Sequence, residues 1–264
     1  MIVHLNNRSL IKVFGKDSES FLQSQLTNDI SKIKDREIQI NAFCQHQGKV
    51  LAILWVFKLD NCFYISVHKE LGEILIKKFN IYKFMSDVVF QDLGSEFLQY
   101  GIIDQNFKNS IKFVENLYLL VSNEEINFNE NDNLWSIGLI NSKIPEVNQY
   151  LSEKFIPQEL NLDIEEVGVS FTKGCYPGQE VVARMHYLGK PKRRLFQFLS
   201  KDEALIGDAI HTGNSTSLKP SGVVISAVHF DGNYHILGTL EIKHEKDHIF
   251  LEGDISRKLT VINA

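Results

Sequence analysis

The chain has 264 residues, of which 44% are hydrophobic and 23% are charged; these proportions are those of a folded globular protein and exclude extensive disorder. Its formal net charge of −5 argues against binding nucleic acid through overall charge, although local cationic patches stay compatible with it. The longest apolar run, residues 50–57, is too short to cross a bilayer, and the polar start lacks a secretory signal's apolar segment. The three cysteines form neither a CxxC pair nor a disulfide framework. We therefore expect a cytoplasmic protein without membrane attachment.

The first half of the chain alternates strand and helix patterns. A strand is predicted over residues 8–14, and Asp17 then offers a cap for a helix over residues 18–26. A second, amphipathic helix is predicted over residues 69–79, and Asp60-Asn61 has the composition of a hairpin turn. The other segments here are rich in β-branched and aromatic residues, and they predict strands over residues 37–44, 50–59, 62–67, 87–92, 97–103 and 117–121.

The last part of the chain is rich in short strand patterns. Before it, the polar stretch 123–133 predicts a surface loop. Asp231-Gly232-Asn233 then marks a hairpin within a series of alternating segments, which predict strands over residues 195–199, 222–230, 234–242 and 248–251. This spacing predicts a small antiparallel barrel or sandwich. The pattern alone thus indicates an α+β fold with a β-rich end.

The segment Lys173–Glu180, Lys-Gly-Cys-Tyr-Pro-Gly-Gln-Glu, contains the most chemically informative residues of the chain; we call it the signature. Its glycines permit backbone conformations that other residues adopt only at a cost, and a helix is predicted to begin at Gln179. Cys175 would then lie near a helix N-terminus, with Lys173 close by and Arg184 within reach. The partial positive charge of the helix end and the charge of these cations both favour the thiolate form of Cys175. An inert cysteine in a glycine-containing turn is the alternative.

The signature resembles that of the YgfZ-type folate-binding proteins, which are relatives of the glycine-cleavage T-protein. Three further segments resemble that family in the expected order: Phe21–Asp29, Gln47–Leu51 and Pro157–Asp163. Four ordered matches are hard to obtain by chance. The resemblance implies an α+β fold of three T-protein-like subdomains around a central opening, with a C-terminal antiparallel β-barrel. It implies a folate-binding region over residues 1–190 and a barrel over residues 191–264, with the signature at the opening.

The resemblance also implies tetrahydrofolate, or a one-carbon derivative, as the cofactor. Tyr176 would stack on the pterin or benzoyl ring, while Gln179 and Glu180 would supply polar contacts. Each of these residues also has an explanation without a ligand. Tyr176 would pack against its neighbours, Gln179 would bond amides of the turn, and Glu180 would complement the helix dipole. The residues that we expect to bind the cofactor are Lys173, Tyr176, Gln179, Glu180, Arg184, Gln25 and Asn28.

The T-protein pattern is broken at one functional position. In the aminomethyl-transfer enzymes the segment that matches Gly48–Ile53 resembles Gly-x-x-x-Asp-Asp. This chain has Ala52 and Ile53 at the two aspartate positions, and neither side chain can carry charge or a proton. We therefore expect a folate-binding accessory factor for iron-sulfur enzymes, including tRNA-modifying enzymes, with Cys175 as the reactive thiol. A folate-dependent aminomethyltransferase is one alternative.

A tRNA-binding module is the other alternative. A cationic run, Arg184 to Arg194, would then contact phosphates, although a short charge run of this kind is more often a solvated turn. The histidines predict no metal site, since Cys44 and His46 supply only two adjacent ligands. His186 is expected to be a partly exposed helix residue.

Overall fold

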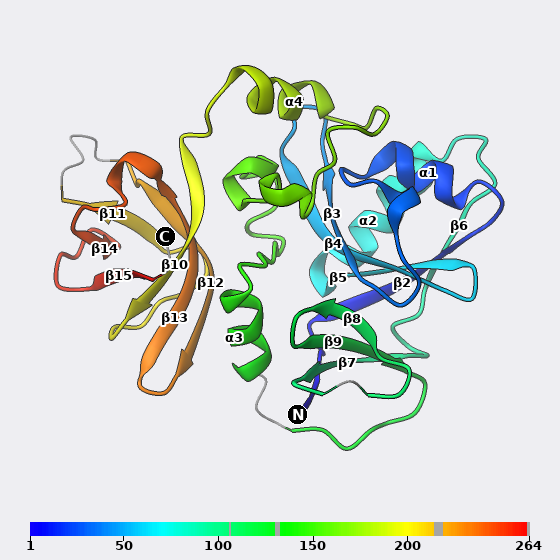
Figure 1. Ribbon diagram of the computed structural model, residues 1–264, viewed down its shortest axis with the longest axis horizontal. Helices are drawn as coiled ribbons and strands as arrows, with labels where there is room; N and C mark the ends of the chain where they lie inside the picture. The colour runs from blue at the N-terminus through cyan, green and yellow to red at the C-terminus, as the bar shows by residue number, and fades with distance from the viewer. Residues whose placement is uncertain (106, 130–132, 214–218, 263–264) are drawn as a thin grey trace.

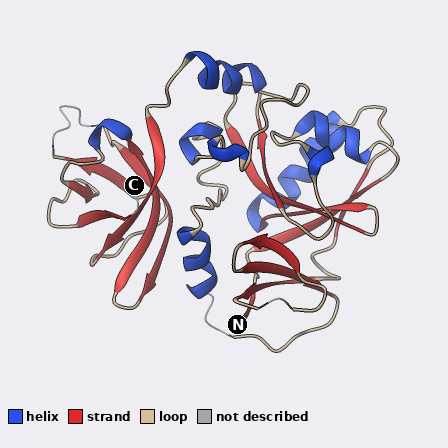
Figure 2. Ribbon diagram, viewed as in Figure 1, coloured by secondary structure: helices blue, strands red, loops and turns tan. Residues whose placement is uncertain are grey.

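The computed structural model describes residues 1–105, 107–129, 133–213 and 219–262 (Figure 1). Two antiparallel sheets and a closed barrel make up the described part, with a helix between the barrel and the sheets (Figures 1 and 2). The helices are α1 (Ser18–Gln25), α2 (Lys69–Tyr82), α3 (Asn133–Asn141) and α4 (Gln179–Leu188).

The larger sheet has five strands in the order β3-β4-β5-β2-β6, namely Gln39–Cys44, Val50–Leu59, Cys62–His68, Arg8–Phe14 and Val89–Asp92. Strand β4 is buried from Val50 to Phe57 because helices and connecting segments cover it. Helix α2 buries Leu71, Leu75 and Phe79, the apolar stripe that the 3.6-residue spacing predicts. Phe79 meets Phe43 from β3 at 5.1 Å between ring centroids, so the helix is anchored to the sheet by aromatic packing.

The smaller sheet has four strands in the order β1-β7-β9-β8, namely Ile2–His4, Leu98–Ile103, Leu117–Ser122 and Ile111–Val114. Trp135 of α3 lies directly over Gly101 of β7, where any side chain would collide with the indole. The same indole contacts Trp55 of β4, with ring centroids 6.2 Å apart, and Phe113 of β8 at 6.5 Å. Helix α3 therefore locks the two sheets together through one aromatic cluster.

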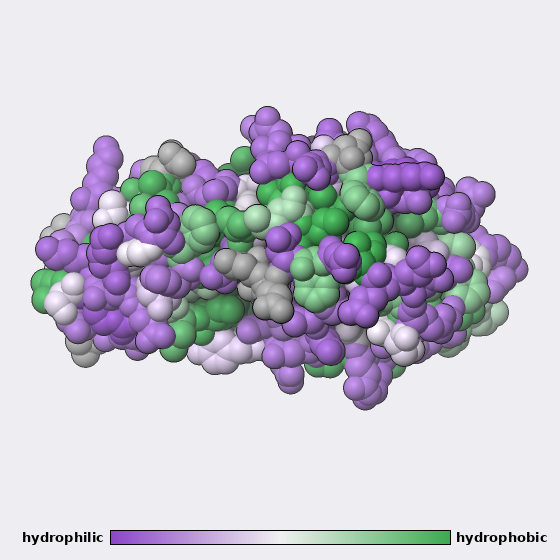
Figure 3. All heavy atoms as spheres, turned by 90° about the horizontal axis from the view of Figure 1, so that it is seen from below, coloured by the Kyte–Doolittle hydropathy of each residue, from purple (hydrophilic) through white to green (hydrophobic). Residues whose placement is uncertain are grey.

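The barrel closes in the order β10-β13-β12-β11-β14-β15, namely Arg193–Ser200, Asn233–Glu241, Gly222–Phe230, Ala209–Thr212, Ile249–Leu251 and Lys258–Ile262. Its own apolar core includes Phe198, Ile210, Val224, Ile236 and Leu251. Polar side chains cover much of the face seen from below, with apolar patches near its middle (Figure 3). Among the residues that the structure describes, no helix is both long and apolar enough to span a bilayer.

The structure confirms the α+β fold, the C-terminal antiparallel barrel and the predicted strands and helices to within a few residues at their ends. The turn Asp60-Asn61 is confirmed, with φ of 50° and 60°. The capping role of Asp17 is wrong: its carboxylate accepts from the Asp87 amide at 2.8 Å and makes no cap bond to α1. The predicted loop 123–133 contains one isolated bridge, from Asn129 to Val3; its residues 130–132 lie outside the described part.

Four strands and one helix were not predicted from the sequence. Helix α3 contains apolar residues on nearly every side, so it lacks the amphipathic spacing by which a helix is recognised. The four strands have only three to five residues each, too few for an alternating pattern to be recognised; they are β1, β8, β11 and β15.

Candidate functional site

Lys173 ties the signature to the C-terminal end of α1. Its ammonium donates to the backbone carbonyls of Gln23, Leu26 and Asn28 at 2.6, 2.5 and 3.0 Å. The last carbonyls of a helix have no partner within the helix, and a cation near them also complements the helix dipole. Burial lowers the pKa of Lys173 to about 8, with nearby Asp29 opposing that shift. The first residue of the signature thus holds the segment Phe21–Asp29.

Tyr176 forms the second anchor of the signature. Its ring is buried, and the Lys173 ammonium lies 5.3 Å from the ring centroid, within the range of a cation–π contact. Burial raises the pKa of the Tyr176 phenol, and the nearby Cys44 adds to that shift. A pterin ring could stack on Tyr176 only if this packing opened.

Gly178 forms the third anchor. It has φ of +82° and lies against the turn between β3 and β4, so an added Cβ would stand 2.5 Å from the Gln45 carbonyl oxygen and 2.7 Å from the Gly48 Cα. Gly48, with φ of +75°, lies in turn against the side chain of Val181. Two glycines therefore allow the hairpin to touch the start of α4, and only glycine fits both the φ value and the spacing.

The segment Pro157–Asp163 supports α4 from its other side. The side-chain amide of Gln158 donates to the Val182 carbonyl at 2.7 Å. Asp163 accepts a two-pronged ion pair from Arg194 at the start of β10, with nitrogen–oxygen distances of 2.5 and 3.0 Å. The three other segments that carry the family resemblance therefore contact either the signature or the helix α4 that follows it.

Between these anchors the signature is open to solvent. Cys175 is exposed, and an added Cβ on Gly174 would meet no atom within 4 Å. Cys44 is buried, and that burial raises the pKa of its thiol to about 12, while Cys62 is partly buried. A loop held at Lys173, Tyr176 and Gly178 thus displays one thiol on the surface.

The other predicted site residues fall into two groups. Gln179 is partly buried, and Glu180 and Arg184 are exposed on α4, so all three are accessible from solvent. Asn28 is buried, and its amide donates to the carbonyls of Ile40 and Val167 at 3.1 and 3.2 Å. Its hydrogen-bonding capacity is therefore largely used in holding the backbone, although it does line a hollow of about 550 Å³.

Gln25 differs from both groups. Its side-chain nitrogen donates to Ser24 at 3.1 Å, but its side-chain oxygen is buried and accepts no hydrogen bond from a described residue. A buried acceptor without a partner costs free energy, and such atoms often mark the position of an absent ligand or water.

The cationic run after the signature is divided by the fold. Arg194 is bound to Asp163, and Arg193 donates to the Ser221 and Pro220 carbonyls at 3.0 and 3.1 Å. Three cations are left exposed: Arg184, Lys190 and Lys192. His186 is exposed on α4, as expected, and its ring stacks on Phe171 at 3.7 Å between centroids.

The expectation that the signature lies at a central opening stays a prediction. A cavity of about 140 Å³ lies where β5, α3 and the barrel strand β12 meet, and its lining includes His68 and Glu146 but no signature residue. This volume is below the range usual for small-molecule sites. The signature lies beside the β3–β4 hairpin, near α4 at the top of Figure 1. The signature packs against the hairpin rather than the barrel because its glycines allow that close approach.

A buried charge network beside this cavity was missed by sequence reasoning. The Arg8 guanidinium donates to Glu146 at 2.5 Å and to the Ser66 hydroxyl at 2.7 Å, and it lies 3.2 Å from the Trp55 ring centroid. Burial lowers the pKa of Arg8 to about 10, with Glu146 opposing that shift. Arg8 is a polar residue at the start of a predicted strand, so no local signal in the sequence indicates that its guanidinium is buried and ion-paired.

Comparisons with known proteins identify relatives of this chain. No family model matches the sequence. An uncharacterized protein from Haemophilus influenzae is 34% identical over 238 residues, which cover 87% of this chain and 85% of that one. The tRNA-modifying protein YgfZ of Aliivibrio fischeri is 27% identical over 264 residues, covering 88% of this chain and 82% of that one. The chain belongs to the YgfZ family.

The fold of this YgfZ family member is similar to that of a glycine-cleavage enzyme. The aminomethyltransferase T of the Bartonella henselae glycine cleavage system superposes with a TM-score of 0.67 at 12% identity, covering 100% of this chain and 84% of that one. The T-protein-like fold is thereby confirmed. Ala52 and Ile53, the positions at which the T-protein pattern leads us to expect carboxylates, are buried in β4.

Proposed function

We propose that this protein is a folate-binding accessory factor that supports the assembly, repair or maintenance of iron-sulfur enzymes, including tRNA-modifying enzymes. The observation that supports this best is the exposed thiol of Cys175 on a loop held by Lys173, Tyr176 and Gly178. A surface cysteine with no structural task needs no such support. The three free cysteines of this protein are in keeping with a reducing, cytoplasmic location.

The thiol would act on a client rather than store a cluster. Iron-sulfur clusters are usually held by four cysteine thiolates, and this chain has three cysteines in separate environments. Cys175 would therefore make a transient contact, either to a cluster iron or to a thiol or disulfide of the client protein. Its exposure permits such a contact without unfolding.

Tetrahydrofolate, or a one-carbon derivative, would bind next to the signature. The unpartnered oxygen of Gln25 fits the amino and ring N–H donors of a pterin. Gln179 and Glu180 would add polar contacts, and the exposed Arg184 would pair with the glutamate tail. Lys173, Tyr176 and Asn28 would act indirectly, by holding the backbone around the ligand. A bound folate would supply one-carbon chemistry or serve as a regulatory ligand.

Aminomethyl transfer is less well supported. The strand position that carries the carboxylates in the transfer enzymes holds Ala52 and Ile53, and both are sealed from solvent. Neither residue can hold a proton or orient an amine. We therefore propose folate binding without turnover.

Calorimetric titration of the pure protein with tetrahydrofolate tests the folate site. Wild type should bind, and Gln25→Leu should weaken binding about ten-fold because a buried hydrogen bond is lost. Gln149→Leu, an exposed position, is the matched control. Absence of binding by wild type would end the folate proposal.

The client role is tested in cells that lack this protein. The activity of an iron-sulfur tRNA-modifying enzyme should fall in these cells, most strongly under oxidative growth, and should return with the wild-type gene. Unchanged client activity without this protein would refute the role.

A further inference from the structure

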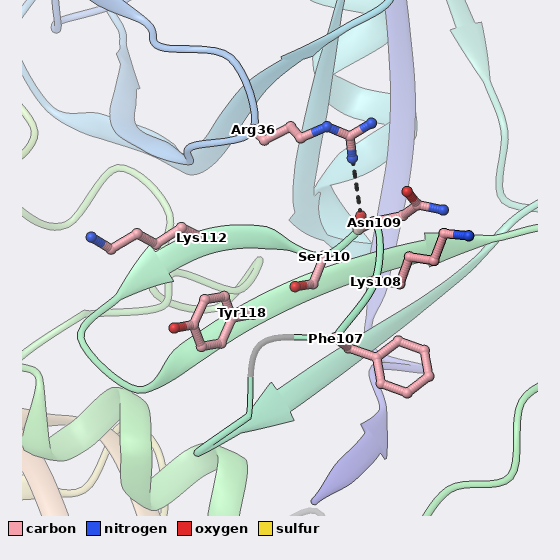
Figure 4. A pocket seen from close by; sticks show the side chains of 7 residues that line it. All are labelled: Arg36, Phe107, Lys108, Asn109, Ser110, Lys112 and Tyr118. Atoms are coloured by element: carbon pink, nitrogen blue, oxygen red, sulfur yellow. Dashed lines mark hydrogen bonds between the residues drawn. The ribbon is translucent and has the colours of Figure 1, made fainter.

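The largest hollow among those described lies on the smaller sheet, far from the signature. It has a volume of about 680 Å³, within the range of known ligand sites. It is formed by the segment before β3, by residues 107–110 that precede β8, and by β8 and β9 (Figure 4). Its lining consists of Arg36, Phe107, Lys108, Asn109, Ser110, Lys112 and Tyr118.

The lining is cationic. Arg36, Lys108 and Lys112 are exposed, and no carboxylate is among the lining residues. Within the described residues, none of the three forms an ion pair, and the carboxylate of the neighbouring Glu37 is turned to Lys34 at 3.6 Å. Three cations with no protein counter-charge make this hollow a local exception on a chain with net charge of −5.

The three cations approach from different elements. Arg36 reaches toward Asn109, whose carbonyl accepts from the guanidinium at 3.5 Å, while Lys108 and Lys112 point to opposite sides of the hollow (Figure 4). This spread suits several phosphates along a chain better than one compact anion, because a single anion would draw its donors to one point.

Aromatic rings lie among these cations. Phe107 is 41% exposed, and Tyr118 is half-buried with its hydroxyl at the hollow (Figure 4). Exposed aromatic rings beside a positively charged groove are the combination by which proteins bind single nucleic-acid strands, with bases stacked on the rings and phosphates on the cations.

We propose that this hollow binds a single nucleic-acid strand, through backbone phosphates on Arg36, Lys108 and Lys112 and a base on Phe107. The site is independent of the folate and thiol chemistry proposed above, since it lies on the smaller sheet and the signature lies near α4 (Figure 1). Failure of either proposal leaves the other unaffected. The binding is salt-dependent, because it rests on phosphate contacts.

Fluorescence polarisation with a labelled RNA of about 12 nucleotides, a length within known single-strand site sizes, tests the proposal. The full-length protein should bind at low salt. The variant Arg36→Glu/Lys108→Glu/Lys112→Glu should weaken binding more than ten-fold and reduce the slope of log affinity against log salt by about 2, from three contacts of about 0.7 each. Phe107→Ser should weaken binding on the order of ten-fold through lost stacking.

The matched control reverses three exposed cations of the barrel region, Lys201→Glu/Lys246→Glu/Lys258→Glu. This control should bind as wild type, and thermal melting should show that every variant is folded. Equal binding of DNA of the same sequence would support strand recognition without sugar preference. The proposal is overturned if wild type does not bind, if the control loses binding and the hollow variant keeps it, or if a free mononucleotide binds as tightly as the strand.

Discussion

Gly48 and Gly178 pack backbone against backbone, and this contact joins the β3–β4 hairpin to the start of α4. A Cβ on Gly178 would stand 2.7 Å from the Gly48 Cα and 2.8 Å from its nitrogen. The contact fixes the end of the loop that carries Cys175. It also explains why glycines recur in two segments that are distant in the sequence.

Substitution of Gly178 by alanine should destabilise the protein by about 2 kcal/mol or more, because the new methyl group meets backbone atoms and φ is +82°. Gly174→Ala is the matched control, since its methyl group would meet nothing within 4 Å. Urea denaturation of both variants checks this. Equal stability of the two variants would show that the glycine contact does not hold the loop.

Lys173→Met should destabilise the protein by about 2 kcal/mol at neutral pH, because three backbone carbonyls at the end of α1 lose their donor. Lys190→Met, at an exposed position, should change stability by less than about 0.5 kcal/mol. A Lys173→Met variant as stable as the control would contradict the anchoring role.

The contribution of Lys173 to stability should also depend on pH. Its pKa falls from the ordinary 10.5 to about 8 on folding, so the unfolded chain binds more protons between those two values. The Lys173 contribution to the free energy of unfolding should therefore rise with pH from about 8 to 10.5. Denaturation of wild type and Lys173→Met across this window should show wild type gaining relative to the variant, and a relative loss would reverse the sign.

His68 should make the stability of the protein depend on pH in the acidic range. Burial lowers its pKa below the ordinary 6.5, with Glu146 and Glu70 opposing and Arg8 adding to the shift. The unfolded chain therefore takes up a proton that the folded protein resists, and stability should be lost as pH falls below 6.5. His68→Gln should lose less stability than wild type in this window, whereas His229→Gln, at an exposed position, should follow wild type.

The three thiols should react in the order of their exposure. Iodoacetamide should modify Cys175 of the folded protein first and Cys62 more slowly. Cys44 should react only after denaturation, because it is buried and its pKa is raised to about 12. Peptide mass spectrometry over a time course measures the order, and modification of Cys44 as early as Cys175 would contradict the structure.

Much of the fold was predictable from local patterns. The spacing of Leu71, Leu75 and Phe79 predicts α2, and the turn Asp60-Asn61 predicts the β4–β5 hairpin, since both signals lie within a few residues. Helix α3 was not predictable, because a helix apolar on nearly every side has no periodic pattern.

The sequence singles out the signature as a candidate site, but it does not show which distant segments contact it. The signature identifies Cys175 and its glycines, yet the contact of Gly178 with Gly48 depends on how a distant hairpin packs. Arg194 and Arg184 look alike in the sequence, and only the fold binds one to Asp163 and leaves the other exposed. Burial separates them, and burial is a tertiary property.

The role of the Cys175 thiol is tested most directly by comparing Cys175→Ala with Cys62→Ala in cells that lack the wild-type protein. The activity of an iron-sulfur tRNA-modifying enzyme is followed under oxidative growth, with both variants expressed at equal levels. We expect Cys62→Ala to restore the enzyme as wild type does and Cys175→Ala to fail to restore it. Full restoration by Cys175→Ala would contradict a role for the Cys175 thiol.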